Sequence, residues 1–170
     1  KLASYAANET EGDADDVINP GEIFEILFEL ENPTPWADAS SIEILLTTEE
    51  EGVAVLAGAW LGGQRGALLM QSSGVGNCIN MFGLMQTCRF PFVAFVTMRG
   101  QWHEFNSWQM PMGQGTAPAL SAMAVNIETV DNPSDVGKQS AAVLHSAFVG
   151  NQMTALLLHQ RLMPEKLFGN

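Results

Sequence analysis

Three groups of residues in this sequence could take part in chemistry. An acidic triplet, Glu49-Glu50-Glu51, opens an Ala-rich apolar run, and by itself such a triplet is most simply the charged first turn of a helix. The stretch from Gln71 to Asn77 contains glycines, which let a backbone pass close to a flat ring, although an ordinary strand-to-helix turn has the same composition. Arg99 follows another apolar run, and its guanidinium matches an oxyanion, with a surface arginine as an equal alternative.

A long segment from Arg99 to Gly115 has no regular periodicity, and long segments of this kind in compact domains are often functional. His103 and Gln114 are its weaker candidates for ligand binding. No metal site is predicted, because the N-terminal aspartates miss the alternating ligand spacing of an EF-hand and the separation of the two cysteines, Cys78 and Cys88, matches no metal motif. Both cysteines are interpreted as core residues of a protein from a reducing compartment.

These residues must be positioned by elements that alternate along the chain. Thr48 suits a helix N-cap, the apolar residues from Val53 to Leu61 keep helical spacing, and Gly62-Gly63 ends that helix. Strands and helices then alternate, as a parallel α/β sheet requires. A glycine-containing loop from Ser72 to Asn77 is expected before the second helix. The predicted strands are 41–47, 66–70, 92–97, 126–130 and 154–159, and the predicted helices are 49–62, 75–88, 116–124 and 133–149.

Composition restricts the class of protein. The sequence has 170 residues and is 46% hydrophobic, which is enough for one globular domain with a sizeable core. The net charge of -12 argues against nucleic acid or an anionic membrane surface as a partner. No apolar run reaches the ~20 residues of a membrane span. The first residues do not resemble a signal peptide, so we expect a cytoplasmic protein.

The charge divides the sequence near residue 51. Residues 1–51 contain 14 of the 19 acidic residues and one basic residue, whereas residues 52–170 contain five acids and six bases. Within the acidic part, D-A-D-D-V-I-N-P-G-E-I-F-E-I-L-F-E-L-E-N-P-T resembles part of a β-sandwich repeat of secreted bacterial proteins, but it is too short for a whole sandwich. Its stretch from Ile23 to Leu30 is predicted as a strand or a short helix. Residues 1–46 are therefore predicted to be an atypical, partly β, acidic segment that precedes the domain of residues 47–170.

From Thr47 onward the chain resembles the pyrimidine-binding (Pyr) domain of thiamine diphosphate enzymes. The likeness is closest to the α subunits of sulfopyruvate decarboxylase and the related phosphonopyruvate decarboxylases. It is carried, in the family's order, by E-E-E-G-V-A-V-L-A-G-A-W-L-G-G, L-L-M-Q-S-S-G-V-G-N-C-I-N, V-T-M-R-G, P-M-G-Q-G-T and L-L-L-H-Q-R-L. The resemblance implies a three-layer α/β domain with a parallel sheet, and a lyase subunit that takes part in decarboxylating a small 2-oxo acid.

The resemblance also implies roles for single residues. The family's catalytic glutamate lies nine residues before the glycine of its A-G-A/G-Y segment, and since that glycine is Gly58 here, the glutamate is Glu49. In the family this glutamate hydrogen-bonds N1′ of the aminopyrimidine, so that N4′ takes the proton from C2 of the thiazolium ring. By the same likeness the cofactor-binding residues are Gln71, Ser73, Gly74, Val75, Gly76 and Asn77, and the substrate-binding residues are Arg99, His103 and Gln114.

Two departures from the family pattern affect the expected assembly. Residues 1–46 contain no V-P-D type loop, which in the family ends the first strand near the active site. The sequence also has no G-D-G followed by N-N, the signature that holds Mg2+ and the diphosphate and that lies on a separate β subunit in two-subunit members. The resemblance therefore implies thiamine diphosphate as cofactor, a β subunit as partner and a hetero-oligomer. The alternative is a noncatalytic binding or structural module with a secreted-type β-repeat at its N-terminus.

Overall fold

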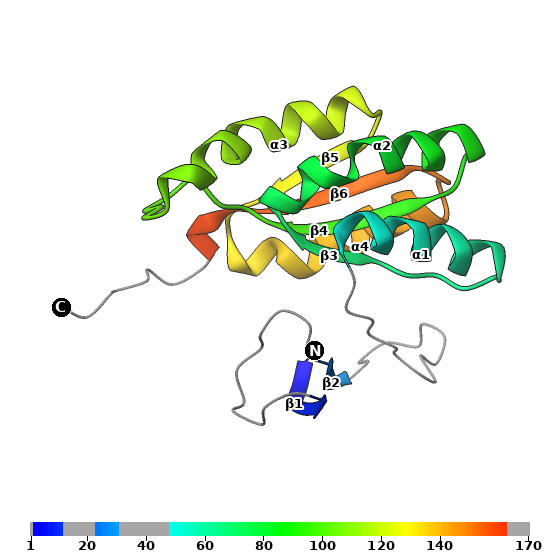
Figure 1. Ribbon diagram of the computed structural model, residues 1–170, viewed down its shortest axis with the longest axis horizontal. Helices are drawn as coiled ribbons and strands as arrows, with labels where there is room; N and C mark the ends of the chain where they lie inside the picture. Colours follow the sequence, from blue (N-terminus) through cyan, green and yellow to red (C-terminus); the bar gives the residue numbers. More distant parts are fainter. Residues whose placement is uncertain (1, 12–22, 31–47, 163–170) are drawn as a thin grey trace. The chain divides into compact units, whose positions relative to one another are not determined.

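The computed structural model describes residues 2–11, 23–30 and 48–162 (Figure 1). The chain divides into two units, Lys1–Leu46 and Thr47–Asn170. The first unit contains the antiparallel pair of β1 and β2, which span Leu2–Glu11 and Ile23–Leu30. The stretch that the sequence left open between a strand and a short helix is therefore a strand. The predicted strand 41–47 and the N-terminal aspartates lie outside the described residues.

The second unit contains a four-stranded parallel sheet in the order β3-β4-β6-β5. Both central strands, β4 and β6, are apolar along nearly their whole length, because both faces of the sheet are covered. The predicted α/β class with a parallel sheet is confirmed. The strands are β3 (Leu68–Gln71), β4 (Phe92–Thr97), β5 (Asn126–Val130) and β6 (Met153–Leu158).

Four helices cover this sheet and complete three layers (Figure 1). One face carries α2 and α3, α1 packs beside α2 and β3, and α4 covers the other face. The helices are α1 (Glu49–Leu61), α2 (Ser72–Cys88), α3 (Met110–Ala122) and α4 (Val136–Phe148), with short 3-10 helices at Ser107–Gln109, Pro133–Asp135 and Gln160–Leu162. Within the described ranges, no helix combines the length and the apolar composition that crossing a membrane requires.

Alternation along the central strands sends side chains into two separate cores. On β4, Phe92 and Val96 join the core beneath α1, α2 and α3, whereas Val93 faces α4 together with Leu156 of β6. The ring of Phe82 from α2 meets the ring of Phe92 edge-on, with 5.3 Å between the centroids. Helices packed on both faces hold the strands firmly, so the strand ends fix the position of the residues that follow them.

The predicted glycine-containing loop from Ser72 to Asn77 is wrong, because α2 begins directly after β3 ends. Glycines at the start of a helix suggest a loop, since each lowers helix propensity by about 1 kcal/mol. Packing overrides that preference here. A Cβ on Gly74 would collide with the side chain of Glu49, and a Cβ on Gly76 would meet Met112 of α3 at 3.6 Å. The glycines allow close approach while the backbone stays helical.

The helix predicted over 116–124 begins earlier, so the irregular segment that was expected to reach Gly115 is shorter. Pro111 lies in the first turn of α3, where the missing N–H of proline does little harm. The glycine-rich start of α3 is helical because glycine lets it pack closely on the preceding chain. A Cβ on Gly113 would stand 2.5 Å from the carbonyl oxygen of Arg99 and 2.8 Å from that of Gly100. The start of α3 is therefore packed directly on the chain that leaves β4.

Candidate active site

Two helix N-termini meet at the carboxyl end of the sheet. β3 ends at Gln71 and leads directly into α2, while α1 precedes β3 and starts at this same end. Glu49, the first residue of α1, reaches α2, where Asn77 Nδ2 donates a hydrogen bond to Glu49 Oε2 at 3.3 Å. Ligands of open α/β sheets bind outside the carboxyl ends of the strands. The contact between α1 and α2 is therefore the candidate active site.

The local sequence decides which glutamate of the triplet reaches α2. Glu51 forms a capping box with Thr48: Thr48 Oγ1 accepts from the Glu51 N–H, and the Glu51 carboxylate accepts from the Thr48 N–H. Glu50 is exposed, whereas Glu49 is half-buried and bonded to Asn77. Because successive helical residues point about 100° apart, the three side chains cannot share one direction. Of the three, Glu49 is the one that contacts α2.

Gly74 allows the Glu49 carboxylate to lie against α2. A Cβ at position 74 would stand 2.5 Å from both Cγ and Oε1 of Glu49, closer than protein atoms approach one another without bonding. α2 has no acidic residue in its own first turn, so Glu49 supplies the negative charge that the positive end of this helix favours. The glycine and the carboxylate therefore form one structural unit across two helices.

The negative charge at this contact affects the pKa of Cys78, a neighbouring residue of α2. The Cys78 thiol is buried and donates to the carbonyl oxygen of Gly74 at 3.5 Å. Burial, followed by the negative charges of Glu49 and Glu50, raises the pKa of the Cys78 thiol to about 12. The predicted core position of Cys78 is confirmed. The same prediction for Cys88 is wrong, because this last residue of α2 is exposed.

A second polar cluster joins β3, α2 and the segment before α3. Gln71 Oε1 accepts hydrogen bonds from Ser73 Oγ at 2.9 Å and from Gln109 Nε2 at 3.3 Å. The backbone N–H of Arg99 donates to the buried hydroxyl of Ser72 at 3.1 Å. These bonds tie three separate stretches of the chain together at the carboxyl end of the sheet.

Arg99 is held in an internal ion pair. Its Nε and Nη2 donate to the two carboxylate oxygens of Glu104 at 2.7 and 2.6 Å. The Glu104 side chain is only 1% exposed, and it also accepts from the N–H groups of Gly100 and Asn106. The hydrogen bond from Arg99, assisted by these N–H groups, holds the pKa of the Glu104 carboxyl well below its usual range. The edge of the guanidinium that was predicted to bind an oxyanion already binds this carboxylate.

Sequence patterns missed two residues of this region, Glu104 and Gln109. Glu104 is the one acidic residue between Glu51 and Glu128, and it follows Arg99 by five positions. A lone acid so close to an arginine was a usable signal for an ion pair. Gln109 has no comparable signal, because only the fold brings it to Gln71.

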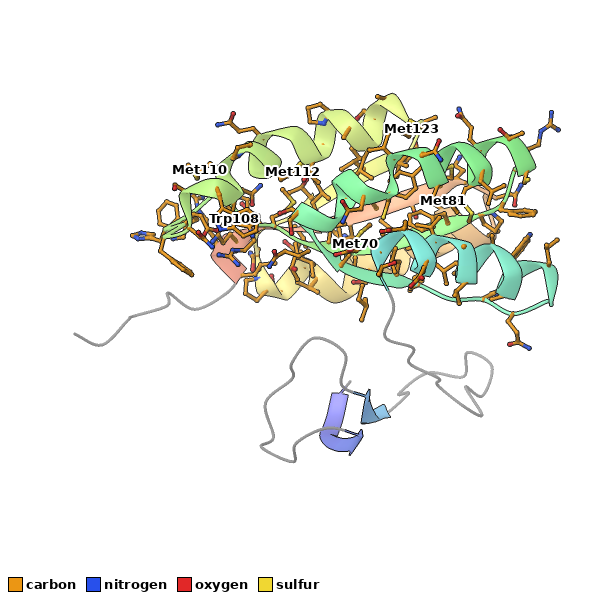
Figure 2. The ribbon with its side chains drawn as sticks, viewed as in Figure 1. Met70, Met81, Trp108, Met110, Met112 and Met123 are labelled. Atoms are coloured by element: carbon orange, nitrogen blue, oxygen red, sulfur yellow. The ribbon has the colours of Figure 1, made fainter. Side chains whose placement is uncertain are left out.

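Helix geometry divides the predicted cofactor-binding residues among different surroundings. Val75 is fully buried in the core, and Gly76 faces Met112 of α3, whose place between the helices is labelled in Figure 2. Glu49 is instead met by Gly74 and Asn77. The stretch from Gln71 to Asn77 therefore cannot face one ligand with all its side chains, because its residues point around a helix.

The two weaker substrate candidates lie on the surface. His103 is exposed and has a φ of 47°, and its ring lies 4.8 Å from the ring of Trp102. Gln114 is exposed on α3. Their positions leave Arg99 as the predicted substrate residue with a direct link to α2, through its backbone bond to Ser72.

Comparisons with known proteins agree with the motifs. No family model matches the chain. The sequence is 41% identical over 96 residues to the sulfopyruvate decarboxylase subunit alpha of Methanococcus maripaludis, a match that spans 56% of this chain and 58% of that protein. It is 33% identical over 128 residues to a phosphonopyruvate decarboxylase of Streptomyces viridochromogenes, across 74% of this chain and 30% of that protein.

The match to a second α subunit is longer. It covers 72% of this chain and 74% of the sulfopyruvate decarboxylase subunit alpha of Methanothermobacter thermautotrophicus, with 32% identity over 123 residues. The resemblance predicted from the motifs is confirmed by these relatives. On the strength of this coverage, the chain belongs to the family of sulfopyruvate decarboxylase α subunits.

Proposed function

We propose that this chain is the α subunit of a thiamine diphosphate-dependent decarboxylase that acts on a 2-oxo acid of the sulfopyruvate or phosphonopyruvate type. The observation that carries the proposal is the contact of Glu49 with Gly74 and Asn77 at the carboxyl end of the sheet. The names of the relatives, sulfopyruvate decarboxylase subunit alpha and phosphonopyruvate decarboxylase, support the substrate class.

The residues at this contact suit the aminopyrimidine part of the cofactor. One oxygen of the half-buried Glu49 carboxylate accepts a hydrogen bond from Asn77, and a carboxylate keeps enough acceptor capacity to bond a ring nitrogen as well. Asn77 limits the rotation of the carboxylate, and the absence of a side chain on Gly74 leaves room for it. When bound, thiamine diphosphate supplies the electron sink that decarboxylation of a 2-oxo acid requires. In this proposal, Glu49 orients the pyrimidine ring and holds a proton at a carboxylate oxygen.

We assign the binding of Mg2+ and the diphosphate to a partner subunit. Three of the relatives are named as subunit alpha, which implies a second subunit in those proteins. The sequence of this chain has no G-D-G followed by N-N. Over the part of the chain that the structure describes, no group of three or more His, Cys, Asp or Glu side chains is arranged to hold a metal ion.

Calorimetry and kinetics test these assignments separately. The chain alone, titrated with thiamine diphosphate and Mg2+, is expected to show no tight binding, whereas its complex with the partner subunit is expected to bind the cofactor and to release CO2 from sulfopyruvate or phosphonopyruvate. Micromolar, Mg2+-dependent binding by the chain alone would contradict the division of the site between subunits. A complex that decarboxylates neither acid would overturn the proposed function.

A further inference from the structure

Gln109 has a buried polar atom without a partner. The residue is 4% exposed, and its Oε1 makes no hydrogen bond within the described residues. Buried acceptors without a donor destabilise a folded protein, so they are rare and need an explanation. Gln109 is the last residue of the short 3-10 helix before α3. Its neighbours in sequence, Trp108 and Met110, are exposed and are labelled in Figure 2. Gln109 is a member of neither apolar core, and its hydrogen bond to Gln71 joins it to the N-cap of α2, the helix that carries Gly74 and Asn77.

The other end of the Gln109 amide supplies the explanation. Its Nε2 donates to Gln71 Oε1 at 3.3 Å, and Ser73 Oγ donates to the same oxygen at 2.9 Å. A carbonyl oxygen has two lone pairs, so the acceptor capacity of the Gln71 amide is fully used. Reversing the Gln109 amide would place two amide oxygens against each other. The unpaired oxygen of Gln109 is thus the consequence of keeping its NH2 group on Gln71.

These bonds leave the NH2 group of Gln71 available. The Gln71 nitrogen makes no hydrogen bond among the described residues and is not one of their fully buried unpaired atoms, so it keeps some contact with solvent in this half-buried residue. Gln71 is the last residue of β3 and the N-cap of α2, a helix of 17 residues, and the Glu49 carboxylate contacts this helix further along, at Gly74 and Asn77. The Gln71 NH2 group is therefore a donor without a partner in the described part of the chain. It lies at the carboxyl end of the sheet, where ligands of open α/β sheets bind and where it suits an acceptor oxygen.

We propose that Gln109 is a positioning residue for the substrate: it fixes the Gln71 amide so that Gln71 donates a hydrogen bond to an oxygen of the anionic 2-oxo acid. The inference rests on the proposed function and deepens it. The carboxylate and carbonyl groups of a 2-oxo acid offer only acceptors, and a sulfonate adds more. Without Gln109, the Gln71 amide can turn its own oxygen toward the substrate and repel it. Gln71 and Ser73 then serve the substrate, whereas the family resemblance implied cofactor binding.

The test uses the chain in complex with its partner subunit and compares Gln109→Leu with the unchanged protein. Leucine removes both the unpaired oxygen and the hydrogen bond to Gln71. We expect the thermal unfolding midpoint to stay the same or rise, KM for the 2-oxo acid to rise about tenfold, and kcat to change less. A lower midpoint with an unchanged KM would show a purely structural role and overturn the inference. Gln86→Leu, at an exposed glutamine of α2, is the matched control and should leave KM unchanged.

Ser73→Ala gives a second measurement that does not depend on the folding of Gln109→Leu. It removes the other donor to Gln71 Oε1 from a partly exposed position, and it should raise KM as well. In a Gln71→Ala background both substitutions should lose their effect on KM, because their common target is gone. Equal effects in both backgrounds would overturn the inference.

Failure of this inference is distinguishable from failure of the proposed function. An active complex in which Gln109→Leu and Ser73→Ala leave KM unchanged would overturn the role of Gln109 alone. A wild-type complex without decarboxylase activity would overturn the proposed function, and the role of Gln109 with it.

Discussion

The carboxylate of Glu49 occupies the space that a side chain on Gly74 would need. The two residues come from different helices, and Asn77, one turn further along α2, donates a hydrogen bond to the same carboxylate. A single methyl group added at position 74 would therefore displace the Glu49 carboxylate. This relationship lets the structural and the catalytic parts of the proposal be tested at one contact.

Gly74→Ala should damage both stability and turnover. The added Cβ would lie 2.5 Å from atoms of Glu49, so α1 or the carboxylate must shift, and overpacking of this kind typically costs about 1–3 kcal/mol of unfolding free energy. Gly83→Ala on the same helix is the matched control. The nearest atom to its Cβ is Cε of Met123 at 3.9 Å, so alanine should stabilise α2 by up to about 1 kcal/mol. Urea unfolding measures both variants, and stabilisation by Gly74→Ala would contradict the close approach.

Of the three glutamates that open α1, Glu49 should be the one whose replacement abolishes most turnover. Glu49→Gln keeps size and polarity but cannot hold the proton that cofactor activation needs, so kcat of the complex should fall while assembly persists. Glu50→Gln changes an exposed side chain and should have little effect. Glu51→Gln weakens a capping box and should lower stability by less than about 1 kcal/mol. A larger loss of kcat in Glu50→Gln or Glu51→Gln would show that the catalytic role does not belong to Glu49.

Hydrophobic spacing predicted the central strands well because it reports burial directly. The strand predicted over 92–97 has those bounds, and the one predicted over 154–159 is shifted by a single residue. The starts of α2 and α3 were wrong for the opposite reason. Their glycines are required by close contacts with residues distant in sequence, which local helix propensity does not include. Gly74 lies against Glu49, and Gly113 lies against the backbone of Arg99.

The candidate site was only partly accessible from the sequence. The family resemblance identified Glu49, but the acidic triplet alone gave no reason to choose among its members, since the choice depends on which side chain caps the helix and which one crosses to α2. Arg99 was predicted to bind a ligand because a guanidinium suits oxyanions, yet its pairing with Glu104 requires the exact path of the chain after β4. The catalytic and binding roles of these residues stay predictions.

The Cys78 thiol offers a measurement of the charge at position 49 in the isolated chain. Burial and the carboxylates of Glu49 and Glu50 raise its pKa to about 12. Glu49→Gln removes one negative charge and should lower this pKa, while burial should keep it above the ~8.5 of an exposed thiol. Thiolate absorbance during an alkaline titration, in a Cys88→Ser background, gives the value. Glu128→Gln, on β5, is the control. An equal Cys78 pKa in both variants would mean that the charge of Glu49 does not act on the Cys78 thiol.

The ion pair of Arg99 and Glu104 should make the fold sensitive to acid. The pKa of Glu104 is depressed in the folded state, chiefly by its hydrogen bond to Arg99. A depressed carboxyl pKa means that the pairing contributes its full stability above the unfolded value of about 4.3 and loses it as the pH falls toward the folded value. Urea unfolding of the chain between neutral pH and about pH 3 should therefore show a steady decrease in unfolding free energy.

Glu104→Gln isolates the share of this acid sensitivity that belongs to the pair. At neutral pH the variant should lose about 3 kcal/mol of unfolding free energy, because an amide replaces a buried carboxylate that accepts from Arg99, Gly100 and Asn106. Its unfolding free energy should then depend less on pH in the acid range, since the group that takes up a proton is gone. Glu128→Gln, which removes an exposed carboxylate, should change neither quantity appreciably. If the unfolding free energy of Glu104→Gln kept its full dependence on acid pH, the proton uptake would belong to other carboxyl groups. The pair of Arg99 and Glu104 would then only hold the segment that carries Gln109 in place.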